Sequence, residues 1–391
     1  MGPIMGSWSP QGDPGALTWR RSRGTLHPDR LGPAYYWVAS LGAPFALIPP
    51  PHRSALGRAH ARVGLLGNPS DGYGGKAMAV LVPNFCASVS IRSAERFVLT
   101  AGPTDGFSFE SVREASEIWR AGQCEDGLRL LRAAVAQFAR QCPLVDTLPP
   151  EDPRLRFEMR YETDIPRQVG LAGSSAIVVA ALRALAQWFQ VSVSPFLLSE
   201  WALASEVDEL GIAAGPMDRV IQSFGGLMQM DLRAPRSPDA YVSLEPALLP
   251  EFFIAWDPIG AASSGRVHGN LRERWRAGEP AVLKAMQSFR ERVDRGVEAL
   301  RQGDLGLFHR LVDENFDARC ALVEVSARDH EMVALARGFG AAAKLCGSGG
   351  AVVGIPARPV DFPQLEAEFH RAGYRFLRPN GSGSNPESAG A

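Results

Sequence analysis

The residues best suited to chemistry begin with a short loop, VGLAGSSA, at residues 169–176. An apolar run follows, so we expect the loop to open a buried helix at about Ser175. The first turn of a helix leaves backbone N–H groups unpaired and carries a partial positive charge, which suits a phosphate. Gly170 and Gly173 would let the backbone curl around such an anion. A serine-capped helix after a glycine turn would explain the same residues without a ligand, and the loop alone does not decide between the two.

Two acidic residues follow this loop at a spacing that could serve the same chemistry. Glu206 lies inside the next expected helix, and Asp218 comes twelve residues later in GPMDRV. A sugar kinase needs one carboxylate to hold magnesium against the phosphates and a second near the acceptor hydroxyl. An exposed helix face would also account for Glu206, which has acidic neighbours at Asp208 and Glu209. A helix cap would account for Asp218.

Two further segments are rich in glycine: GNPSDGYGGK at residues 67–76 and CGSGGA at residues 346–351. The first is not a Walker A loop, because Ser70 stands at the first glycine and Ala77 at the residue that would hold magnesium. No loop fits GxGxxG within a strand–helix unit, which argues against a dinucleotide site. A tight hairpin between two apolar strands would by itself explain the second segment.

The elements that must position these loops are expected on both sides of them. Regular structure is predicted to begin near residue 61, and Pro83 and Asn84 are predicted to form a hairpin between two strands. The other predicted strands include 155–162, 225–231, 252–257, 341–347 and 351–356, and the long helices of the second half are 270–301 and 305–322. Strands and helices follow one another irregularly, which favours an α+β fold over a doubly wound sheet.

The composition is that of an ordinary globular chain. The 391 residues are 46% hydrophobic and 21% charged, and 41 basic residues nearly cancel 42 acidic ones. No field of one sign favours nucleic acid or an anionic membrane as a partner, and the apolar runs are too short to span a membrane. Five scattered cysteines without a CxxC pair indicate reduced thiols, with no disulfide framework or zinc site, which predicts a cytoplasmic location.

The two ends of the chain differ in composition from the rest. Residues 1–58 are rich in Pro, Gly and Arg and nearly free of acidic residues, so we expect a disordered or leader extension. A transit peptide, and with it a plastid location, is the alternative, although amphipathic helical spacing is absent. Residues 379–391 are of low complexity and are predicted to be a disordered tail. Removal of residues 1–57 is expected to leave activity intact.

The three loops, taken in order, resemble the motifs of the GHMP kinase superfamily, which includes galactokinases, mevalonate kinases and homoserine kinases. ARVGLLGNPSDGY resembles the first motif, VGLAGSSA the second, which is the phosphate loop, and KLCGSGGAVV the third. The resemblance covers about residues 61–378 and implies an α+β fold of two lobes. Residues 59–245 would form a ribosomal S5 domain 2-like N-terminal lobe, and residues 246–378 a ferredoxin-like C-terminal lobe.

Within the superfamily the chain most resembles the plant-type glucuronokinases. The segments that carry this are RVGLLGNPSDGYGGK, TDIPRQVGLAGSSAIV, ELGIAAGPMDRVIQSFGGLMQMD, SSGRVHGNLRERW, NFDARC and AAAKLCGSGGAVV. Galactokinases usually carry Glu-His where this chain has Asn68 and Pro69, which argues against galactose as the acceptor. The resemblance implies transfer of phosphate from ATP, with Mg²⁺, to the anomeric hydroxyl of D-glucuronate, giving D-glucuronate 1-phosphate for salvage towards UDP-glucuronate. The alternatives are another sugar-1-kinase, galactokinase- or arabinokinase-like, and a non-catalytic sugar sensor on the same fold.

The resemblance also assigns roles to single residues. Asp218 would accept the proton from the anomeric hydroxyl, Arg62 would orient Asp218 and spread charge on the moving phosphoryl group, and Ser175 and Glu206 would hold magnesium. The ATP phosphates would lie against Gly170, Leu171, Ala172, Gly173, Ser174, Ser175 and Ala176, and the third loop would contribute Gly347, Ser348 and Gly349. The sugar would be bound by Asp71, with Arg167, Arg266 and His268 as candidates for the contact with its carboxylate. Small molecules are therefore the expected partners, and the oligomeric state stays open.

Overall fold

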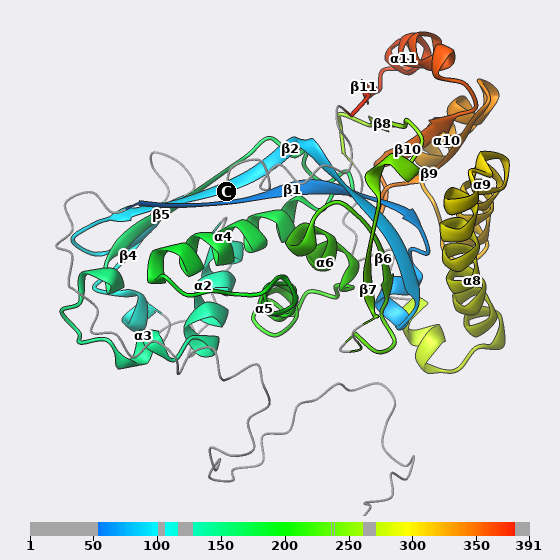
Figure 1. Cartoon of the computed structure of the whole chain (residues 1–391). Helices are drawn as coiled ribbons and strands as arrows, with labels where there is room; N and C mark the ends of the chain where they lie inside the picture. The colour runs from blue at the N-terminus through cyan, green and yellow to red at the C-terminus, as the bar shows by residue number, and fades with distance from the viewer. Residues whose placement is uncertain are drawn as a thin grey trace, which may run out of the picture. The chain divides into compact units, whose positions relative to one another are not determined.

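The computed structural model describes residues 54–100, 106–115, 128–235, 237, 239–260 and 271–379 (Figure 1). Two candidates for the sugar carboxylate, Arg266 and His268, lie outside these ranges, as do most of the predicted N-terminal extension and the predicted tail after residue 379. In the part of the chain that is described, no helix is both long and apolar enough to cross a membrane.

The larger sheet has seven strands in the order β4-β3-β5-β2-β6-β7, with β1 paired to β2. Neighbours run antiparallel except β3 and β5, which are parallel. The strands are β1 (Ser54–Leu66), β2 (Lys76–Ser93), β3 (Phe97–Thr100), β4 (Gly106–Phe109), β5 (Phe157–Thr163), β6 (Leu227–Asp231) and β7 (Tyr241–Leu244). Short turns of helix precede β2, β5 and the strand β8 (Phe253–Trp256) in the chain: η3 (Ser70–Tyr73), η4 (Pro153–Leu155) and η5 (Pro246–Leu248). The half-buried strand predicted over 155–162 is confirmed by β5.

The predicted hairpin at Pro83 and Asn84 is wrong, because β2 runs through both residues as one strand of 18 residues. Its pairing with β1 shifts at this point, from His60 opposite Cys86 to Ala61 opposite Val82, so that residues 83–85 have no partner in β1. Proline has no N–H to give to the ladder, and a bulge accommodates it without turning the chain.

β1 also begins earlier than the sequence indicated, at Ser54. Its side chains alternate between exposed and buried from the first residue, but the inward positions are Ala55, Gly57 and Ala59. Such small residues make a weak hydrophobic alternation, which hid the strand. The truncation point expected at residue 57 therefore falls inside β1.

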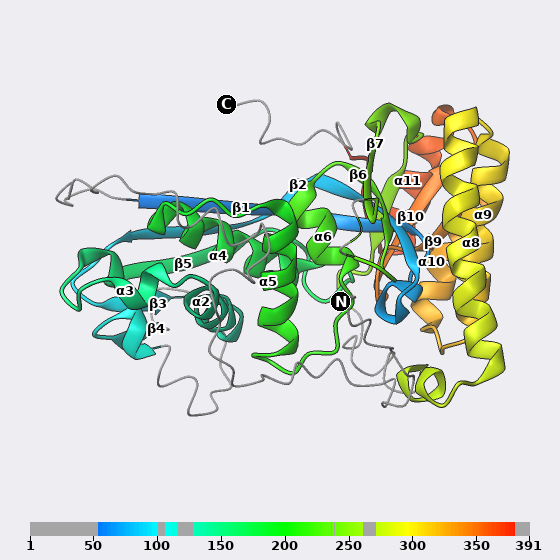
Figure 2. The same cartoon turned by 60° about the horizontal axis from the view of Figure 1, so that its bottom comes forward.

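Four helices lie together on one face of the large sheet (Figures 1 and 2). They are α2 (Arg129–Gln141), α4 (Gly173–Phe189), α5 (Pro195–Val207) and α6 (Met217–Phe224), and the short α3 (Leu144–Thr147) follows α2. Aromatic rings join the layers: the Phe157 ring of β5 lies 5.5 Å from Trp188 of α4, and Phe138 of α2 stacks 5.4 Å from Phe189 of α4. These buried rings fix α4, and with it the loop at its N-terminus, against the sheet.

The smaller sheet has four strands in the order β11-β8-β10-β9, all antiparallel. The strands are β8 (Phe253–Trp256), β9 (Ala341–Leu345), β10 (Ala351–Pro356) and β11 (Arg375–Leu377), so the order by sequence within this sheet is 4-1-3-2. With α10 (Ala327–Gly338) and α11 (Phe362–Arg371) packed on it, this sheet confirms the predicted ferredoxin-like lobe. The turn η6 (Pro359–Asp361) leads into α11.

The long helices α8 (Pro280–Gln302) and α9 (Leu305–Cys320) lie side by side, and a short helix over residues 271–276 precedes them (Figure 2). The helix predicted over 305–322 is confirmed by α9, whereas the helix predicted over 270–301 is divided at residues 277–279 into the short helix and α8. The sequence missed α10. The apolar side chains that α10 buries are only Met332, Val333 and Ala336, a pattern too short to stand out in the sequence. The boundary predicted after residue 245 falls between β7 and β8, and contacts join both sheets in one compact unit, so that boundary stays a prediction.

The two sheets are tied together by the buried side chain of Lys344, on β9. It is 1% exposed, and its Nζ donates hydrogen bonds to the carbonyl oxygens of Gly64 at 2.7 Å and Leu345 at 2.7 Å and to Oδ1 of Asn68 at 2.8 Å. The backbone N–H of Gly64 in turn donates to the carbonyl oxygen of Cys346 at 2.9 Å. The first and third glycine-rich segments are therefore held against each other through the interior.

Replacing Lys344 should lower the free energy of unfolding. Lys344→Met leaves oxygen acceptors buried without a donor, and we expect a loss of about 1–3 kcal/mol in the free energy of unfolding near neutral pH. Burial lowers the pKa of Lys344 from 10.5 to about 7, so folding releases a proton at pH values between these two. Wild type should therefore gain stability over the variant as pH rises through this window, on the order of 1 kcal/mol per pH unit.

Urea unfolding of both proteins at about pH 6.5, 8 and 9.5 measures the effect. Lys284→Met, at an exposed position of α8, is the matched control. A difference between wild type and Lys344→Met that stays constant or shrinks with rising pH would contradict the expectation.

Candidate active site

Arg62, on β1, is the residue around which the site is assembled. Its Nε donates to Oδ1 of Asp218 at 2.7 Å, and its Nη1 donates to the carbonyl oxygens of Gly170 at 2.6 Å and Cys346 at 3.4 Å. The Arg62 side chain is 5% exposed and that of Asp218 is 18% exposed. One planar guanidinium group thus joins the first strand, the loop before α4, the first turn of α6 and the third loop. The expected proximity of Arg62 and Asp218 is observed.

The phosphate-loop candidate and the third loop pack backbone against backbone. Gly170 has a φ of +73°, and a Cβ there would come within 2.8 Å of the carbonyl oxygen of Gly349. A Cβ on Gly347 would clash with the carbonyl oxygen of Gly170. These glycines are therefore required for the close approach of two loops.

The loop ends at α4, which begins at Gly173, two residues before the predicted start. Ala172 is the N-cap in a left-handed conformation, with a φ of +64°, and its carbonyl oxygen accepts a hydrogen bond from Nε2 of Gln222 at 3.0 Å. The buried, 17-residue α4 directs its free N–H groups and the positive end of its dipole at this loop.

Glu206 is not on an exposed helix face: it is 1% exposed and lies opposite the start of α4. Its Oε2 accepts a hydrogen bond from Nε of Arg219 at 2.6 Å and also contacts Nη2 of the same residue. Its Oε1 accepts a hydrogen bond from Oγ of Ser174 at 3.2 Å. The hydroxyl of Ser175, which is fully buried, donates instead to the carbonyl oxygen of Ala172 at 3.1 Å. The structure thus brings Ser174, rather than Ser175, to Glu206.

Arg219 connects the two carboxylates that the sequence singled out. It lies one residue after Asp218 and pairs with Glu206, while its Nη1 is 3.5 Å from Oδ2 of Asp218. Burial opposes the charge, but the carboxylates of Glu206 and Asp218 raise the pKa of Arg219 overall, so it stays a cation. Sequence reasoning missed this residue. The sequence feature that could have indicated Arg219 is its position directly after Asp218. Consecutive side chains on a helix point in different directions, so Arg219 can contact Glu206 while Asp218 contacts Arg62.

Asp71, on η3, adds a third carboxylate to the cluster. Burial, and then the negative charge of Asp218, raises the pKa of Asp71 from 3.8 to about 6, while Arg62 opposes the shift. Its carboxylate packs directly against the backbone of Gly215, at the start of α6, where a Cβ would clash with Oδ2. Three carboxylates and two guanidinium groups therefore form one network of charges, which places the expected sugar ligand Asp71 beside Asp218.

Two residues that the sequence did not assign hold the third loop in place. Arg319 of α9 is 3% exposed, and its Nη1 and Nη2 donate to the carbonyl oxygens of Gly347 and Ser348, each at 2.9 Å. Asp329 of α10 accepts a hydrogen bond from the N–H of Gly350 at 2.7 Å. NFDARC, which contains Arg319, was part of the family resemblance, whereas Asp329 lies on the helix that was missed.

Two further residues that the sequence singled out differ in their exposure. Arg167 is exposed, at the N-terminal side of the phosphate-loop candidate. Asn68, whose identity argued against galactose, is 3% exposed, and its side-chain oxygen accepts a hydrogen bond from Lys344. Its backbone oxygen accepts a hydrogen bond from Nδ2 of Asn315 at 3.0 Å. Asn68 thus serves the junction of the two sheets.

The oxygen atoms near the phosphate-loop candidate suit a hard cation. Ser174 Oγ and Glu206 Oε1 are neighbours, and Mg²⁺ is commonly bound by one or two protein oxygens together with substrate phosphates and waters. Among the described residues no group of three or more His, Cys, Asp or Glu could hold a metal ion by itself. At described positions, Cys142, Cys320 and Cys346 form no disulfide bond.

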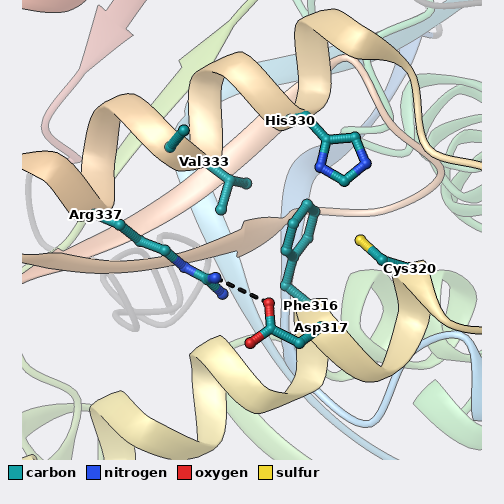
Figure 3. Close-up of a pocket in the computed structure, with 7 residues that line it drawn as sticks. Phe316, Asp317, Cys320, His330, Val333 and Arg337 are labelled. Carbon is teal, nitrogen blue, oxygen red and sulfur yellow. Dashed lines mark hydrogen bonds and ion pairs between the residues drawn. The ribbon is translucent and has the colours of Figure 1, made fainter.

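A cavity of about 340 Å³ lies elsewhere, between α9 and α10 (Figure 3). It is lined by Phe316, Asp317, Cys320, His330, Val333, Ala334 and Arg337. At one end, Nη1 of Arg337 donates to Oδ1 of Asp317 at 2.9 Å, the interaction drawn in Figure 3. None of its lining residues belongs to the cluster around Asp218.

Comparison with known proteins agrees with this arrangement. Residues 129–226 match the model of the GHMP kinases N terminal domain, and residues 297–375 match that of the GHMP kinases C terminal region. Glucuronokinase 1 of Arabidopsis thaliana is 35% identical over 332 residues, which cover 81% of this chain and 89% of that protein.

Solved structures of two related kinases share the fold. The mevalonate kinase of Methanococcus jannaschii is 16% identical with a TM-score of 0.66, covering 85% of this chain and 100% of that one. The galactokinase of Lactococcus lactis, solved with galactose, is 14% identical with a TM-score of 0.64, covering 84% and 95%. The two-lobed α+β fold, the order of the three loops and the similarity over most of the chain lead to one conclusion: this chain belongs to the GHMP kinase family.

Proposed function

We propose that the chain is an ATP-dependent glucuronokinase. It transfers the γ-phosphoryl group of ATP to the anomeric hydroxyl of D-glucuronate, giving D-glucuronate 1-phosphate and ADP, a product suited to salvage towards UDP-glucuronate. The observation that supports it most is that Arg62 contacts both Asp218 and the phosphate-loop candidate. Its Nε donates to Asp218, and its Nη1 donates to the carbonyl oxygen of Gly170 at 2.6 Å. The 35% identity to Glucuronokinase 1 supports the choice of sugar.

The proposed reaction depends on two residues at the acceptor. The anomeric oxygen of the sugar bonds to the γ-phosphorus, and the bond between the γ-phosphorus and the β–γ bridging oxygen breaks. Asp218 accepts the proton that the anomeric hydroxyl loses in this step. Arg62 binds Oδ1 of Asp218. The other carboxylate oxygen, Oδ2, lies 3.5 Å from Nη1 of Arg219. An anomeric hydroxyl is more acidic than an ordinary alcohol, which makes a carboxylate base effective.

The nucleotide phosphates are proposed to bind at the N-terminus of α4, where unpaired N–H groups face the loop. Mg²⁺, when bound, would neutralise charge on the phosphates, and the residues that fit it are Ser174 and Glu206. Arg219 holds the second oxygen of Glu206, so the carboxylate presents Oε1 in one orientation. The cytoplasmic location, with the plastid as its alternative, stays a prediction.

Asp218→Asn should nearly abolish turnover, by about 10²–10⁴-fold in kcat, because an amide cannot accept the proton. The affinity for ATP should change little, since Asp218 contacts the acceptor side. Phosphate transfer from ATP to D-glucuronate and ATP binding by calorimetry measure the two effects. A variant with wild-type turnover would remove Asp218 from the mechanism.

The same assay on a panel of sugars tests the proposed substrate. A wild-type enzyme that prefers galactose or arabinose to uronic acids would favour the galactokinase- or arabinokinase-like alternative. A purified protein that binds sugar but transfers no phosphate would favour the sugar sensor.

Ser174→Ala should raise the Mg²⁺ concentration for half-maximal activity by about tenfold, because it removes the hydroxyl beside Glu206. Ser175→Ala is the matched control, since its hydroxyl is committed to a backbone carbonyl, and the requirement should change by less than about twofold. Activity titrated against Mg²⁺ measures both variants. A larger effect in Ser175→Ala would return the ligand role to Ser175.

Asp71 should give the reaction an acidic limit. With the pKa of Asp71 raised to about 6, the carboxyl is protonated below that pH and loses an acceptor for a sugar hydroxyl. We expect kcat/KM for the sugar to fall about tenfold per pH unit below this point, and Asp71→Asn to show a lower value without that slope.

The stability of the same variant provides the control. The pKa of Asp71 is raised from 3.8 to about 6 on folding, so the charged carboxylate lowers the stability of the wild type as pH rises between these two values. Asp71→Asn lacks this charge and should be at least as stable as wild type at neutral pH. A retained acidic limb in the variant would show that another group sets it.

A further inference from the structure

Three successive carbonyl groups of the phosphate-loop candidate are turned towards β1 and α6. The carbonyl oxygen of Gly170 accepts a hydrogen bond from Nη1 of Arg62 at 2.6 Å. That of Leu171 accepts one from the backbone N–H of Arg62 at 3.3 Å. The carbonyl oxygen of Ala172 accepts one from Nε2 of Gln222 at 3.0 Å. The orientation of each peptide in this part of the loop is therefore set by a donor from another element.

The N–H groups of the same peptides belong to residues 171–173. A trans peptide directs its N–H group away from its carbonyl oxygen, and these peptides are trans. Among the described residues, these three N–H groups have no hydrogen-bond partner. Successive free N–H groups at a helix N-terminus suit an anion, so the donors that hold the carbonyl groups also direct the N–H groups at a ligand.

Gln222 holds the last of these peptides from α6. It is 1% exposed and lies four residues after Asp218, so the two side chains share one face of the helix. Its Nε2 donates a second hydrogen bond, to the carbonyl oxygen of His60 on β1, also at 3.0 Å. An amide nitrogen has two hydrogens, so both are used, and Ala172 is joined through Gln222 to β1 as well as to α6.

The peptide after Ala172 needs such support. Ala172 has a φ of +64°, a left-handed conformation that a Cβ disfavours. It is the N-cap of α4, and it has no side-chain cap hydrogen bond. Its carbonyl oxygen also accepts hydrogen bonds from within α4, from Oγ of Ser175 and the N–H of Ala176, each at 3.1 Å. Gln222 adds a contact from a different element, which fixes the start of α4 relative to the helix that carries Asp218.

We propose that Gln222 is a positioning residue for phosphoryl transfer. By fixing the peptide between Ala172 and Gly173, it directs the N–H of Gly173 at the nucleotide phosphates and holds the loop against the helix that carries Asp218. This rests on the proposed function, since it takes the N-terminus of α4 as the site of the ATP phosphates.

The test compares Gln222→Met with wild type. Methionine is similar in length and volume but has no donor, so the carbonyl oxygen of Ala172 loses its contact with α6. We expect the Kd for ATP, measured by calorimetry, to rise by about fivefold. The Kd for D-glucuronate should change by less than about twofold, because Gln222 acts on the loop and not on the acceptor.

Arg183→Met is the matched control, because Arg183 of α4 holds the C-terminal end of the same helix. Its Nη2 donates to the carbonyl oxygens of Gln222 and Ser223, each at 3.2 Å. It lies ten residues after Gly173, about 15 Å along α4 from the loop. This variant should lose stability, as Gln222→Met does, but keep the Kd for ATP within about twofold of wild type. An equal rise in the Kd for ATP in both variants would overturn the proposal.

Two further variants keep the proposal falsifiable if Gln222→Met misfolds. Gln222→Asn keeps the amide but is one methylene shorter and cannot reach both carbonyl oxygens, so its Kd for ATP should rise by about threefold. Adding Ala172→Gly to Gln222→Asn should recover part of the lost affinity, because glycine adopts the left-handed conformation without the cost of a Cβ. A double variant that binds ATP no more tightly than Gln222→Asn would contradict a role through this peptide.

The outcomes separate this inference from the proposed function. The Kd for ATP is measured without sugar, so a wild-type enzyme that phosphorylates neutral sugars in place of uronic acids would overturn the proposed function alone. A wild-type preference for uronic acids, together with an unchanged Kd for ATP in the Gln222 variants, would overturn the inference alone. Equal rises in the Kd values for ATP and D-glucuronate would also overturn it, because they would indicate a merely structural role for Gln222.

Discussion

The structure depends on one buried guanidinium group. Arg62 contacts the acceptor carboxylate Asp218, the backbone of the phosphate-loop candidate and the backbone of the third loop. These partners lie more than a hundred residues from Arg62 in sequence. Removing the arginine would leave buried oxygens unpaired and free three loops at once, whereas the planar group with five donors satisfies them together.

Other buried basic side chains extend this arrangement outward. Arg219 holds Glu206, Arg319 holds the third loop, and Lys344 holds the first strand against the smaller sheet. Each has oxygen partners on a different element, so its burial is compensated only when those elements are in place. The site is thereby specified by polar interactions within a frame whose stability comes from the apolar core between α4 and the sheet.

Asp71 and Tyr73 come from η3, between two long strands, and the Tyr73 ring lies 5.5 Å from the ring of Trp275 on the helix over residues 271–276. The phosphate-loop candidate comes from the N-terminus of α4. The first glycine-rich segment and the phosphate-loop candidate are therefore held by different elements of the fold.

The sequence by itself determined the order of the three glycine-rich loops, the α+β class and most strands and long helices, and it singled out Arg62, Asp218 and Glu206 as candidates. These follow from local composition and from spacing along the chain. Only the tertiary structure decided which serine meets Glu206, that β2 passes through Pro83 as a bulge, and that Arg219, Arg319 and Lys344 complete the centre. The physical reason is that a hydrogen bond has a range of about 3 Å, so it depends on how elements distant in sequence are packed.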